Sequence, residues 1–489
     1  MSGHKTARIL VYTHRWLGIA LGVLFVVWFV SGIVMMYARM PELSTTERLA
    51  RLPAINSAHI RTVPPAPAEG DITRLTIGTL EGRPVFRVTA RGRTDLVFAD
   101  TGDALAPVDA DQAIRIARAF LGGATEVHYD AKLTDADQWS FGIRGRMPVH
   151  RIAADDAAGT RLYVTENGGE VVLKTTASGR FWGWTGAVLH WLYFAPFRRH
   201  AALWNDTIVW VSIAGTVMCL VGVVWGLWRL APIRGYRLRD HRQWSPYAGW
   251  MRWHHYAGLI FGIVTTTWIF SGLLSMDPWD WHPSTAPTRE QRSRVADGSI
   301  ASPDLSVDKL RTVIDAFKPD HPKEIEITRF HGHYYAIAGT GIVSFDAPQF
   351  GARDQLPADL IVGAASVAMA GVPIDGMTWL DRYDAYYYDR DGALSLPVLR
   401  VRYADPQQTW LYFDPKRGTI ARKEERLTRL NRWLYHGFHS LDFPFLYYQR
   451  PLWDVVVIGL SIGGIVLSAT TLSASWRRVK RSITGASRS

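Results

Sequence analysis

The sequence predicts a membrane protein of the α+β class. We expect a four-helix transmembrane bundle made from two tandem repeats, each of which carries an extracytoplasmic α+β domain. Three observations predict this fold. Four apolar stretches reach the length of about 20 residues that crosses a bilayer. Basic residues gather in the short segments beside them. Two sets of residues recur at constant offsets along the 489-residue chain.

The four apolar stretches contain no Lys or Arg, and Asp454 is their only charge. We expect spans over residues 17–37, 207–228, 257–276 and 452–475. The first stretch is longer than the apolar part of a signal peptide and offers no small-x-small cleavage site, so we interpret it as a retained anchor. The single cysteine, Cys219, lies in the second stretch and excludes an intramolecular disulfide.

The formal charge of +11 is concentrated beside the spans. The basic residues of the N-terminal flank, the linker between spans two and three, and the tail are Lys5, Arg8, Arg15, Arg229, Arg234, Arg237, Arg239, Arg242, Arg252, Arg477, Arg478, Lys480, Arg481 and Arg488, against Asp240 alone. Short positive segments mark the cytoplasmic side. We therefore expect both termini inside, two large domains outside, and the lipid bilayer rather than nucleic acid as the partner.

This topology predicts an order of parts along the chain. They are a cytoplasmic N-terminus with the first span (1–37), the first outer domain (38–180), an interfacial helix with the second span (181–228), a basic loop (229–252), the third span (253–276), the second outer domain (277–430), an interfacial segment with the fourth span (431–475) and a basic tail (476–489).

The internal repeat holds one register over long stretches. At an offset of 240, "THRWLGIALG" meets "WHHYAGLIFG", so that His14 corresponds to His254. At an offset of 249, "TRLYVTENGGEVV" meets "TWLYFDPKRGTIA", and His190 corresponds to His439. Chance matches do not keep one register over so many residues.

Each outer domain is expected to contain a helix followed by an antiparallel sheet. The helices are predicted over 109–122, with Asp109 as the N-cap, and over 358–371. Strands are predicted for "QWSFGIRG", "PVHRIAAD" and "TRLYVTENGGEVV", and for "AYYYDRDG", "PVLRVRYAD" and "TWLYFDPKRGTI".

The repeated histidines suggest a cofactor. Residues four apart lie on nearly the same helix face, so one strip carries His14, Gly18 and Gly22, and the other carries His254, Gly258 and Gly262. Taken separately, the histidine can be explained as an interfacial side chain and the glycine strip as a surface for close helix packing. Joined and duplicated, they favour a flat macrocycle beside the backbone with a nitrogen ligand, which fits heme b.

The second histidine pair, His190 and His439, falls at the outer side of the membrane. We therefore expect two bis-histidine hemes, one per layer, with heme iron held by His14, His254, His190 and His439. Lesser candidates for the iron are His255, His436 and His200, none of which has a histidine at its corresponding position. His331 and His333 could bind a metal as a strand pair, but a surface turn is favoured. No residue is assigned a catalytic role.

The chain resembles the PepSY-associated transmembrane-helix family. The resemblance rests on His14-Arg15-Trp16-Leu17-Gly18, Ser31-Gly32, "GFHSLDFPF" and "RPLWD", and on the Thr-x-Leu-Tyr hairpins, which are similar to those of PepSY domains. It implies a bacterial inner-membrane protein with periplasmic PepSY domains, similar to iron-regulated membrane proteins and siderophore reductases that carry b-type hemes. The first half departs from the pattern after His190, where Ser-Leu-Asp-Phe is missing.

The function this implies is transfer of electrons across the membrane to a periplasmic acceptor, with a ferric siderophore of iron uptake as one such acceptor. The sequence contains no nucleotide-binding motif, so the electrons would come from a membrane quinol or an electron-donor protein. The alternative is a non-enzymatic, membrane-anchored PepSY protein that binds or regulates a peptidase. In that case the histidines would be packing residues.

Overall fold

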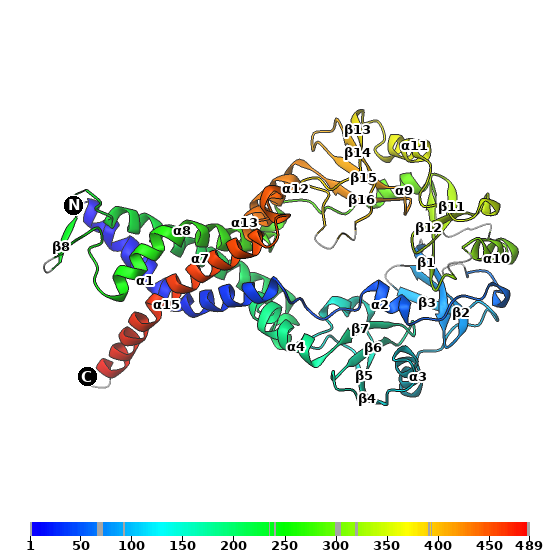
Figure 1. Cartoon of the computed structure of the whole chain (residues 1–489), viewed down its shortest axis with the longest axis horizontal. Coiled ribbons are helices and arrows are strands. Elements are labelled where there is room, and N and C mark those ends of the chain that lie inside the picture. The colour runs from blue at the N-terminus through cyan, green and yellow to red at the C-terminus, as the bar shows by residue number, and fades with distance from the viewer. Residues whose placement is uncertain are drawn as a thin grey trace. The chain divides into compact units, whose positions relative to one another are not determined.

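The computed structural model describes the chain except for residues 1, 66–71, 91–92, 234, 239–240, 299–304, 318–320, 390–391, 393 and 487–489. Arg234, Arg239, Asp240 and Arg488, which were counted in the charge pattern, lie outside the described residues. The chain forms two compact units (Figure 1). The helical unit comprises Met1–Met40, Gly179–His282 and Leu430–Ser489, and the sheet unit comprises Pro41–Ser178 and Pro283–Arg429.

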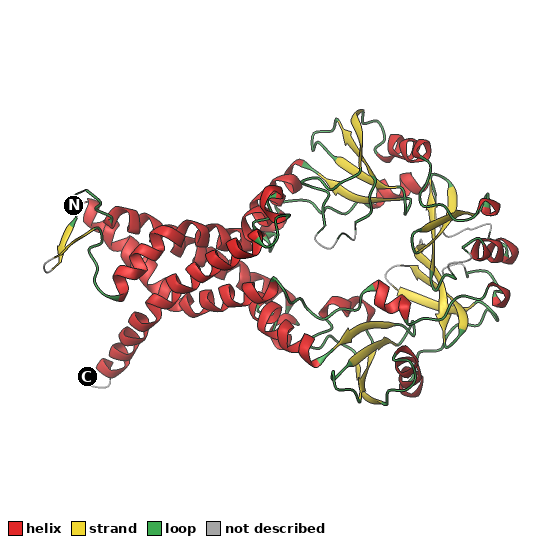
Figure 2. Ribbon diagram, in the orientation of Figure 1, coloured by secondary structure: helices red, strands yellow, loops and turns green. Residues whose placement is uncertain are grey.

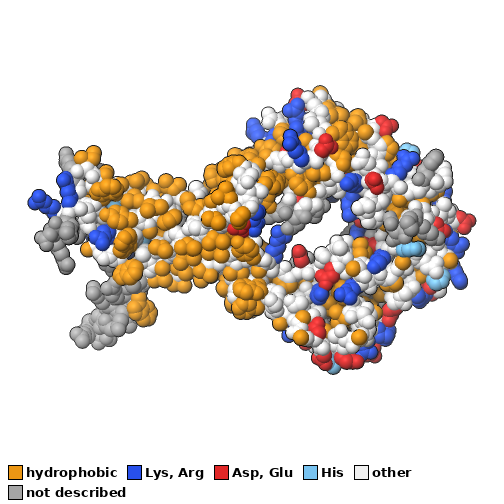
Figure 3. Space-filling model, in the orientation of Figure 1, with side chains coloured by type: hydrophobic (Ala, Val, Ile, Leu, Met, Phe, Trp, Pro, Cys, Tyr) orange, Lys and Arg blue, Asp and Glu red, His pale blue; other side chains and the backbone are white. Residues whose placement is uncertain are grey.

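Four long helices make up the core of the helical unit (Figure 2). They are α1 (Ser2–Met35), α7 (Ala201–Arg229), α8 (Trp250–Leu274) and α15 (Leu452–Ala486). All four are long and apolar enough to cross a membrane, which agrees with the four predicted spans. Hydrophobic side chains cover most of the bundle face seen in Figure 3, whereas the sheet unit carries mixed charges.

The four helices are arranged as a square. Helix α1 packs against α7 and α15, and α8 packs against the same two neighbours. Helices α1 and α8, which hold corresponding residues at the offset of 240, therefore occupy opposite corners. Side chains that point inward from α1 and α8 meet on the bundle axis.

Short segments precede α7 and α15 and match one another in kind. The first series is α4 (Ala177–Gly183), the π-helical turn η3 (Trp184–Val188), α5 (Leu189–Trp191) and α6 (Ala195–Arg198). The second is α12 (Arg426–Asn431), the π-helical turn η6 (Arg432–Gly437), α13 (Phe438–Ser440) and α14 (Pro444–Tyr447). A small hairpin, β8 (Tyr236–Leu238) and β9 (His241–Gln243), lies between α7 and α8, and η4 (Pro278–Asp280) follows α8.

Two four-stranded antiparallel sheets belong to the sheet unit. One has the order β4 (Val127–Leu133), β5 (Val149–Ala154), β6 (Arg161–Thr165), β7 (Val171–Thr175), and the other has the order β13 (Ile374–Leu380), β14 (Val398–Tyr403), β15 (Trp410–Asp414), β16 (Thr419–Glu424). Helix α3 (Ala110–Phe120) shares a core with the first sheet, and α11 (Ala358–Ala368) with the second. These elements confirm the predicted α+β character.

The predicted helix at 109–122 is confirmed in detail. The Asp109 side chain accepts a hydrogen bond of 2.7 Å from the Gln112 backbone N–H and so caps α3. One apolar face of this helix is buried, and it consists of Ala113, Ile116, Ala117 and Phe120. Helix α11 begins at Ala358 as predicted and ends at Ala368, three residues earlier than expected.

The strands predicted for "QWSFGIRG" and "AYYYDRDG" are wrong. The first segment forms the 3₁₀ turn η2 (Phe141–Arg146), and the described part of the second has no regular structure. In each case an aspartate side chain turns the backbone: Asp137 accepts from the N–H groups of Trp139 and Ser140, and Asp384 from those of Tyr386 and Tyr387. Such local bonds compete with a strand ladder, and the edge strands are β4 and β13 instead.

A six-stranded antiparallel sheet joins the two segments of the sheet unit. Its order is β12 (Gly341–Ser344), β11 (His333–Ala338), β10 (Ile325–Phe330), β1 (Ile72–Leu80), β2 (Arg83–Ala90), β3 (Arg93–Phe98). Strands β1 and β10 pair through Leu75 and Ile327. This sheet has no counterpart among the predicted elements. Around it lie α2 (Thr45–Ala50), η1 (Ser57–His59), α9 (Arg289–Ala296), α10 (Val307–Asp315) and η5 (Pro348–Phe350).

An ion pair reinforces this junction. The Arg48 guanidinium donates to both oxygens of Glu324 at 2.8 Å, and the two side chains are only 13% and 9% exposed. Burial alone would raise the pKa of the Glu324 carboxyl, but the Arg48 hydrogen bonds and the charges of Arg48, Arg87 and Arg74 hold that pKa below its ordinary value. The stabilisation is therefore present at neutral pH and is lost as the pH falls through the lowered pKa.

We predict that Glu324→Gln lowers the stability of the sheet unit by about 2 kcal/mol, because it weakens a charge-assisted, mostly buried pair. The measurement is the thermal unfolding midpoint of the purified chain at neutral pH. Glu290→Gln is the control, because Glu290 forms only an exposed ion pair with Arg294 along one helix and should change the midpoint little. Equal midpoints for the two variants would contradict the prediction.

Candidate functional site

The four predicted histidines of the helical unit meet in two pairs. His14 of α1 and His254 of α8 face one another across the bundle, with ring centroids 6.0 Å apart. His190 of α5 and His439 of α13 form a second pair, with ring centroids 6.1 Å apart. In both pairs the partners are the residues that correspond at the offsets of 240 and 249.

Backbone carbonyls orient the His14–His254 pair. The Nδ1 atom of His14 lies 2.9 Å from the Met218 carbonyl oxygen, and that of His254 lies 3.1 Å from the Leu467 carbonyl oxygen. Met218 and Leu467 themselves correspond at the offset of 249. A carbonyl only accepts hydrogen bonds, so Nδ1 carries the proton in each neutral ring and the lone pair is left on Nε2.

The His190–His439 pair is oriented in a similar way. His190 Nδ1 donates to the Trp28 carbonyl at 3.1 Å, and His439 Nδ1 donates to the Trp268 carbonyl at 3.2 Å. The hydroxyls of Ser31 and Ser271 also lie 3.1 Å from these nitrogens. The Ser31 hydroxyl donates its own proton to the Val27 carbonyl at 2.6 Å, so its oxygen is the acceptor toward His190.

The Nε2 atoms of the four rings have no hydrogen-bond partner among the described residues. Each ring thus presents an unprotonated nitrogen, held by a second-shell bond on the other side, which is the usual arrangement of a metal-ligating histidine. Two imidazoles on opposite sides of one metal ion, with bonds of about 2 Å, have ring centres about 6 Å apart. Both observed separations are close to this value.

The two pairs differ from sites that hold a bare metal ion. Within the described part of the chain, no group of three or more His, Cys, Asp or Glu side chains is placed to bind one. Two imidazoles alone fit a metal whose other ligands come from a macrocycle, as in bis-histidine heme.

The His190–His439 pair is neutral at physiological pH. Burial, and to a smaller extent the nearby His439, lowers the pKa of His190 to about 4. Burial also lowers the pKa of His439. A histidine must be in the neutral form to bind a metal. Because burial already favours this form here, metal binding would not have to displace a proton from either ring.

Unusual backbone surrounds the second pair. His190 and His439 each follow a π-helical turn, η3 or η6. Two residues beyond each histidine, Leu192 and Leu441 adopt the left-handed conformation with φ of 51°. Left-handed backbone at a residue other than Gly, Asn or Asp costs about 1–2 kcal/mol, and π-turns occur frequently at functional sites.

The predicted glycines lie beside neighbouring helices. A Cβ atom would stand 3.6–3.9 Å from its nearest neighbour at Gly18, Gly22 and Gly258, and 2.9 Å from Val223 at Gly262. A methyl group would therefore fit at the first three positions and collide at Gly262. Their expected role beside a macrocycle stays a prediction.

Gly222, which was not predicted as a site residue, lies closest of the glycines to a histidine ring. A Cβ atom at Gly222 would lie 2.5 Å from Cε1 of His14. Gly222 comes four residues after Met218, about one helical turn along α7. A side chain at position 222 would therefore cover the Met218 carbonyl that accepts the hydrogen bond from His14. Because Thr471 occupies the corresponding position, the repeat contains no signal for Gly222. A Cβ atom at Gly32 or Gly272 would stand 3.5 or 3.6 Å from Cε1 of His190 or His439, which is ordinary van der Waals contact.

The competing histidines lie elsewhere. His255 is buried and uses both nitrogens, Nε2 toward the Gly226 carbonyl and Nδ1 toward the Ser245 hydroxyl, each at 2.8 Å. It therefore has no lone pair for a metal. His200 is an exposed residue before α7, and the ring of His436 lies against Tyr435. In the sheet unit, His333 pairs with Asp346, and His331 lies in a left-handed turn.

One buried polar atom near the second pair lacks a partner. Trp28 Nε1 donates to the His190 carbonyl at 2.9 Å, whereas Nε1 of the corresponding Trp268 is buried without a hydrogen-bond acceptor among the described residues. A buried N–H of this kind is costly and fits a polar group that the protein chain itself does not supply.

The family described as the PepSY-associated TM region matches residues 11–478 of the chain, which include all four histidines. No curated protein matches the chain in sequence.

We predict that His255→Ala destabilises the helical unit by about 1–3 kcal/mol, because the variant leaves Ser245 and the Gly226 carbonyl without their buried partner. The purified chain should unfold at a lower temperature than the wild type. The exposed His200→Ala variant is the control and should unfold with the wild type. An unchanged midpoint for His255→Ala would contradict its structural role.

Proposed function

The chain belongs to the family of PepSY-associated transmembrane proteins, and from this premise we propose that it is a heme-b membrane oxidoreductase. Each histidine pair would hold one heme, and electrons would pass across the bacterial inner membrane to a periplasmic acceptor. One observation carries the proposal: two histidine pairs, 6.0 and 6.1 Å apart, each ring anchored at Nδ1 and open at Nε2.

The residues of the chain would prepare each site before a heme binds. The carbonyls of Met218, Leu467, Trp28 and Trp268 fix the tautomer and leave the lone pair on Nε2. Hydrogen bonding at Nδ1–H also raises the basicity of Nε2. Heme bound in this way would supply a reversible one-electron Fe(III)/Fe(II) couple, whose potential depends on axial ligation, hydrogen bonding and burial.

The spacing of the pairs along the bundle supports a path across the membrane. His14 and Ser31, which contacts His190, are 17 residues apart on α1, a rise of about 25 Å. This distance is most of the roughly 30 Å hydrocarbon thickness of a bilayer. Buried aromatic side chains occupy the intervening region, where Phe25 packs on Trp28 and Phe29 on Trp268.

The charge pattern supports one orientation of the chain in the membrane. Basic residues beside the His14–His254 end of the spans favour a cytoplasmic location for both termini, which would put the His190–His439 pair and the sheet unit on the periplasmic side. A membrane quinol or an electron-donor protein would supply electrons. A ferric siderophore is an acceptor consistent with the family resemblance.

The correspondence between halves supports an origin by tandem duplication. The pairs of acceptor carbonyls, the π-helical turns and the left-handed leucines all correspond at the sequence offsets. Under this proposal an ancestral unit contributed one histidine to each layer, and pseudo-two-fold symmetry brings the ligands together in the centre.

We predict that each pair binds about half of the heme. In detergent-purified chain from heme-replete cells, a Soret band and dithionite-dependent α and β bands are expected. His14→Ala or His254→Ala should remove about half of the heme, and His190→Ala or His439→Ala the other half, because each variant removes one of the two imidazoles that would hold that heme. Heme content is measured as the pyridine hemochrome per protein.

His200→Ala is the control for this series and should keep the full heme content. A colourless wild-type preparation would overturn the heme proposal and favour the non-enzymatic PepSY function. Unchanged heme in both variants of one pair would overturn the two-site arrangement.

A matched pair of glycine variants tests the anchoring of His14. Gly222→Ala would place a methyl group 2.5 Å from the ring, whereas Gly459→Ala on α15 meets no atom within 4 Å. We predict that Gly222→Ala loses most of the heme of the His14–His254 pair, about half of the total, and that Gly459→Ala loses none. Both variants keep all four histidines, so equal heme contents would show that the position of His14 does not depend on Gly222.

A further inference from the structure

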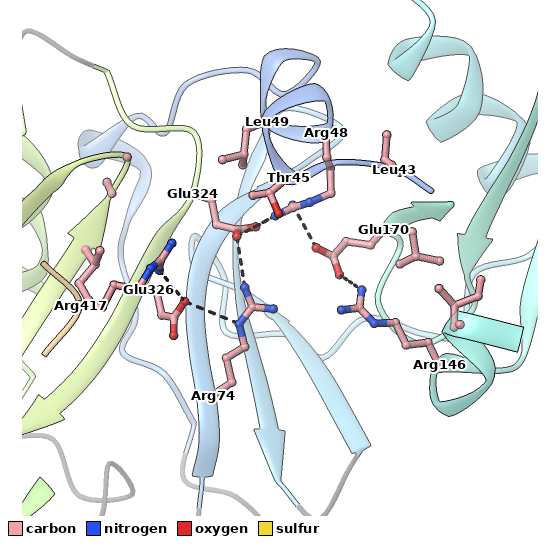
Figure 4. A pocket seen from close by; sticks show the side chains of 16 residues that line it. Leu43, Thr45, Arg48, Leu49, Arg74, Arg146, Glu170, Glu324, Glu326 and Arg417 are labelled. Atoms are coloured by element: carbon pink, nitrogen blue, oxygen red, sulfur yellow. Dashed lines mark hydrogen bonds and ion pairs between the residues drawn. The ribbon is translucent and has the colours of Figure 1, made fainter. Parts of the chain in front are cut away.

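The sheet unit contains a cavity where its two segments meet. It has a volume of about 330 Å³ and is lined from both segments, by α2, β1, η2 and the start of β7 in the first and by β10, β11 and Arg417 in the second (Figure 4). Leu43, Ile143 and Ile337 contribute apolar wall, and four arginines and three glutamates contribute charge.

The charged residues form an alternating chain across the cavity. Glu324 lies between Arg48 and Arg74, Glu170 between Arg48 and Arg146, and Glu326 between Arg74 and Arg417 (Figure 4). Each carboxylate is thus shared by two guanidinium groups. Every carboxylate in the cavity is already paired with arginine, so none is available for a cation. The four arginines also outnumber the three glutamates.

The arginines fall into two kinds. Arg48 is mostly buried and makes short bonds to Glu324, so its role is structural. The other three have long contacts: Arg74 at 3.4 Å from Glu324, Arg146 at 3.8 Å from Glu170 and Arg417 at 4.0 Å from Glu326. Their side chains are 41%, 52% and 54% exposed. Most of the five N–H donors of each guanidinium are unused by the described residues.

We propose that this cavity binds a small polycarboxylate anion, whose carboxylates accept hydrogen bonds from Arg74, Arg146 and Arg417. The planar guanidinium fork matches a carboxylate in a bidentate geometry. The volume is at the lower end of the range for small-molecule sites, which selects a compact ligand over a peptide. Because Arg146 and Arg417 come from different segments, the ligand bridges them.

The same anion has two forms that share this chemistry, the free polycarboxylate and its complex with a trivalent metal ion. The ferric complex would be an electron acceptor of the kind proposed above, and only this link rests on the proposed function. Binding itself needs no heme and no electron.

Isothermal titration of the full-length chain in detergent, with citrate as the probe at low ionic strength, tests the site. We expect saturable binding that weakens by about tenfold or more in Arg146→Gln and in Arg417→Gln, because each loses charge-assisted hydrogen bonds. Arg83→Gln is the matched control: its side chain is 44% exposed and paired with Asp100 away from the cavity, so it should bind as the wild type does.

A second titration uses gallium(III) citrate, a redox-inert analogue of the ferric complex. Arginine-dependent binding of either probe supports the site, and the tighter probe identifies the form that it takes. Binding of neither probe, or equal weakening in Arg83→Gln, overturns the proposal. Heme absorbance recorded on the same samples separates the two hypotheses, since loss of citrate binding leaves heme content unchanged and loss of heme leaves citrate binding unchanged.

Discussion

The hydrogen bond from a histidine Nδ1–H to a backbone carbonyl is the interaction on which the rest of the helical unit depends. All four rings of the two pairs make it, with acceptors at Met218, Leu467, Trp28 and Trp268. A carbonyl within a helix already accepts the N–H four residues later, and its position is fixed by that ladder. It therefore holds the ring more rigidly than a side-chain acceptor would, and it leaves Nε2 as the only free nitrogen.

Much of this arrangement follows from the sequence, because corresponding residues of the two halves meet. The offset of 240 selected His254 over His255. In the structure, both nitrogens of His255 form hydrogen bonds, one with the Ser245 hydroxyl and one with the Gly226 carbonyl. The offset of 249 selected His439 over His436, and His439 is the residue that faces His190. Register is informative here because histidines that correspond at one offset lie next to one another in the structure.

Other features had no signal that sequence reasoning could use. The pairing of β1 with β10 joins segments about 250 residues apart, and the choice between edge partners depends on tertiary packing rather than on local propensity. The strands predicted around Asp137 and Asp384 failed because side-chain bonds to the following N–H groups turn the chain. Gly222 was not predicted because its role depends on contact with the ring of His14, which lies on another helix.

The backbone around the second pair bears on whether these histidines are only packing residues. Leu192 and Leu441 are held in the left-handed conformation in both halves, each after a π-helical turn. Together the two leucines cost about 2–4 kcal/mol, a large fraction of the net stability of a typical domain. Packing alone would be served by an ordinary helix at no such cost. The strain is explained if the turn must place Nδ1 of His190 and His439 against the Trp28 and Trp268 carbonyls. The hydrogen bonds around the two histidines differ in one respect. Trp28 Nε1 donates to the His190 carbonyl, whereas Trp268 Nε1 has no acceptor among the described residues. The imidazole nitrogens at corresponding positions thus keep the same kind of carbonyl contact while the tryptophan Nε1 contacts differ, which supports the proposed role of these nitrogens.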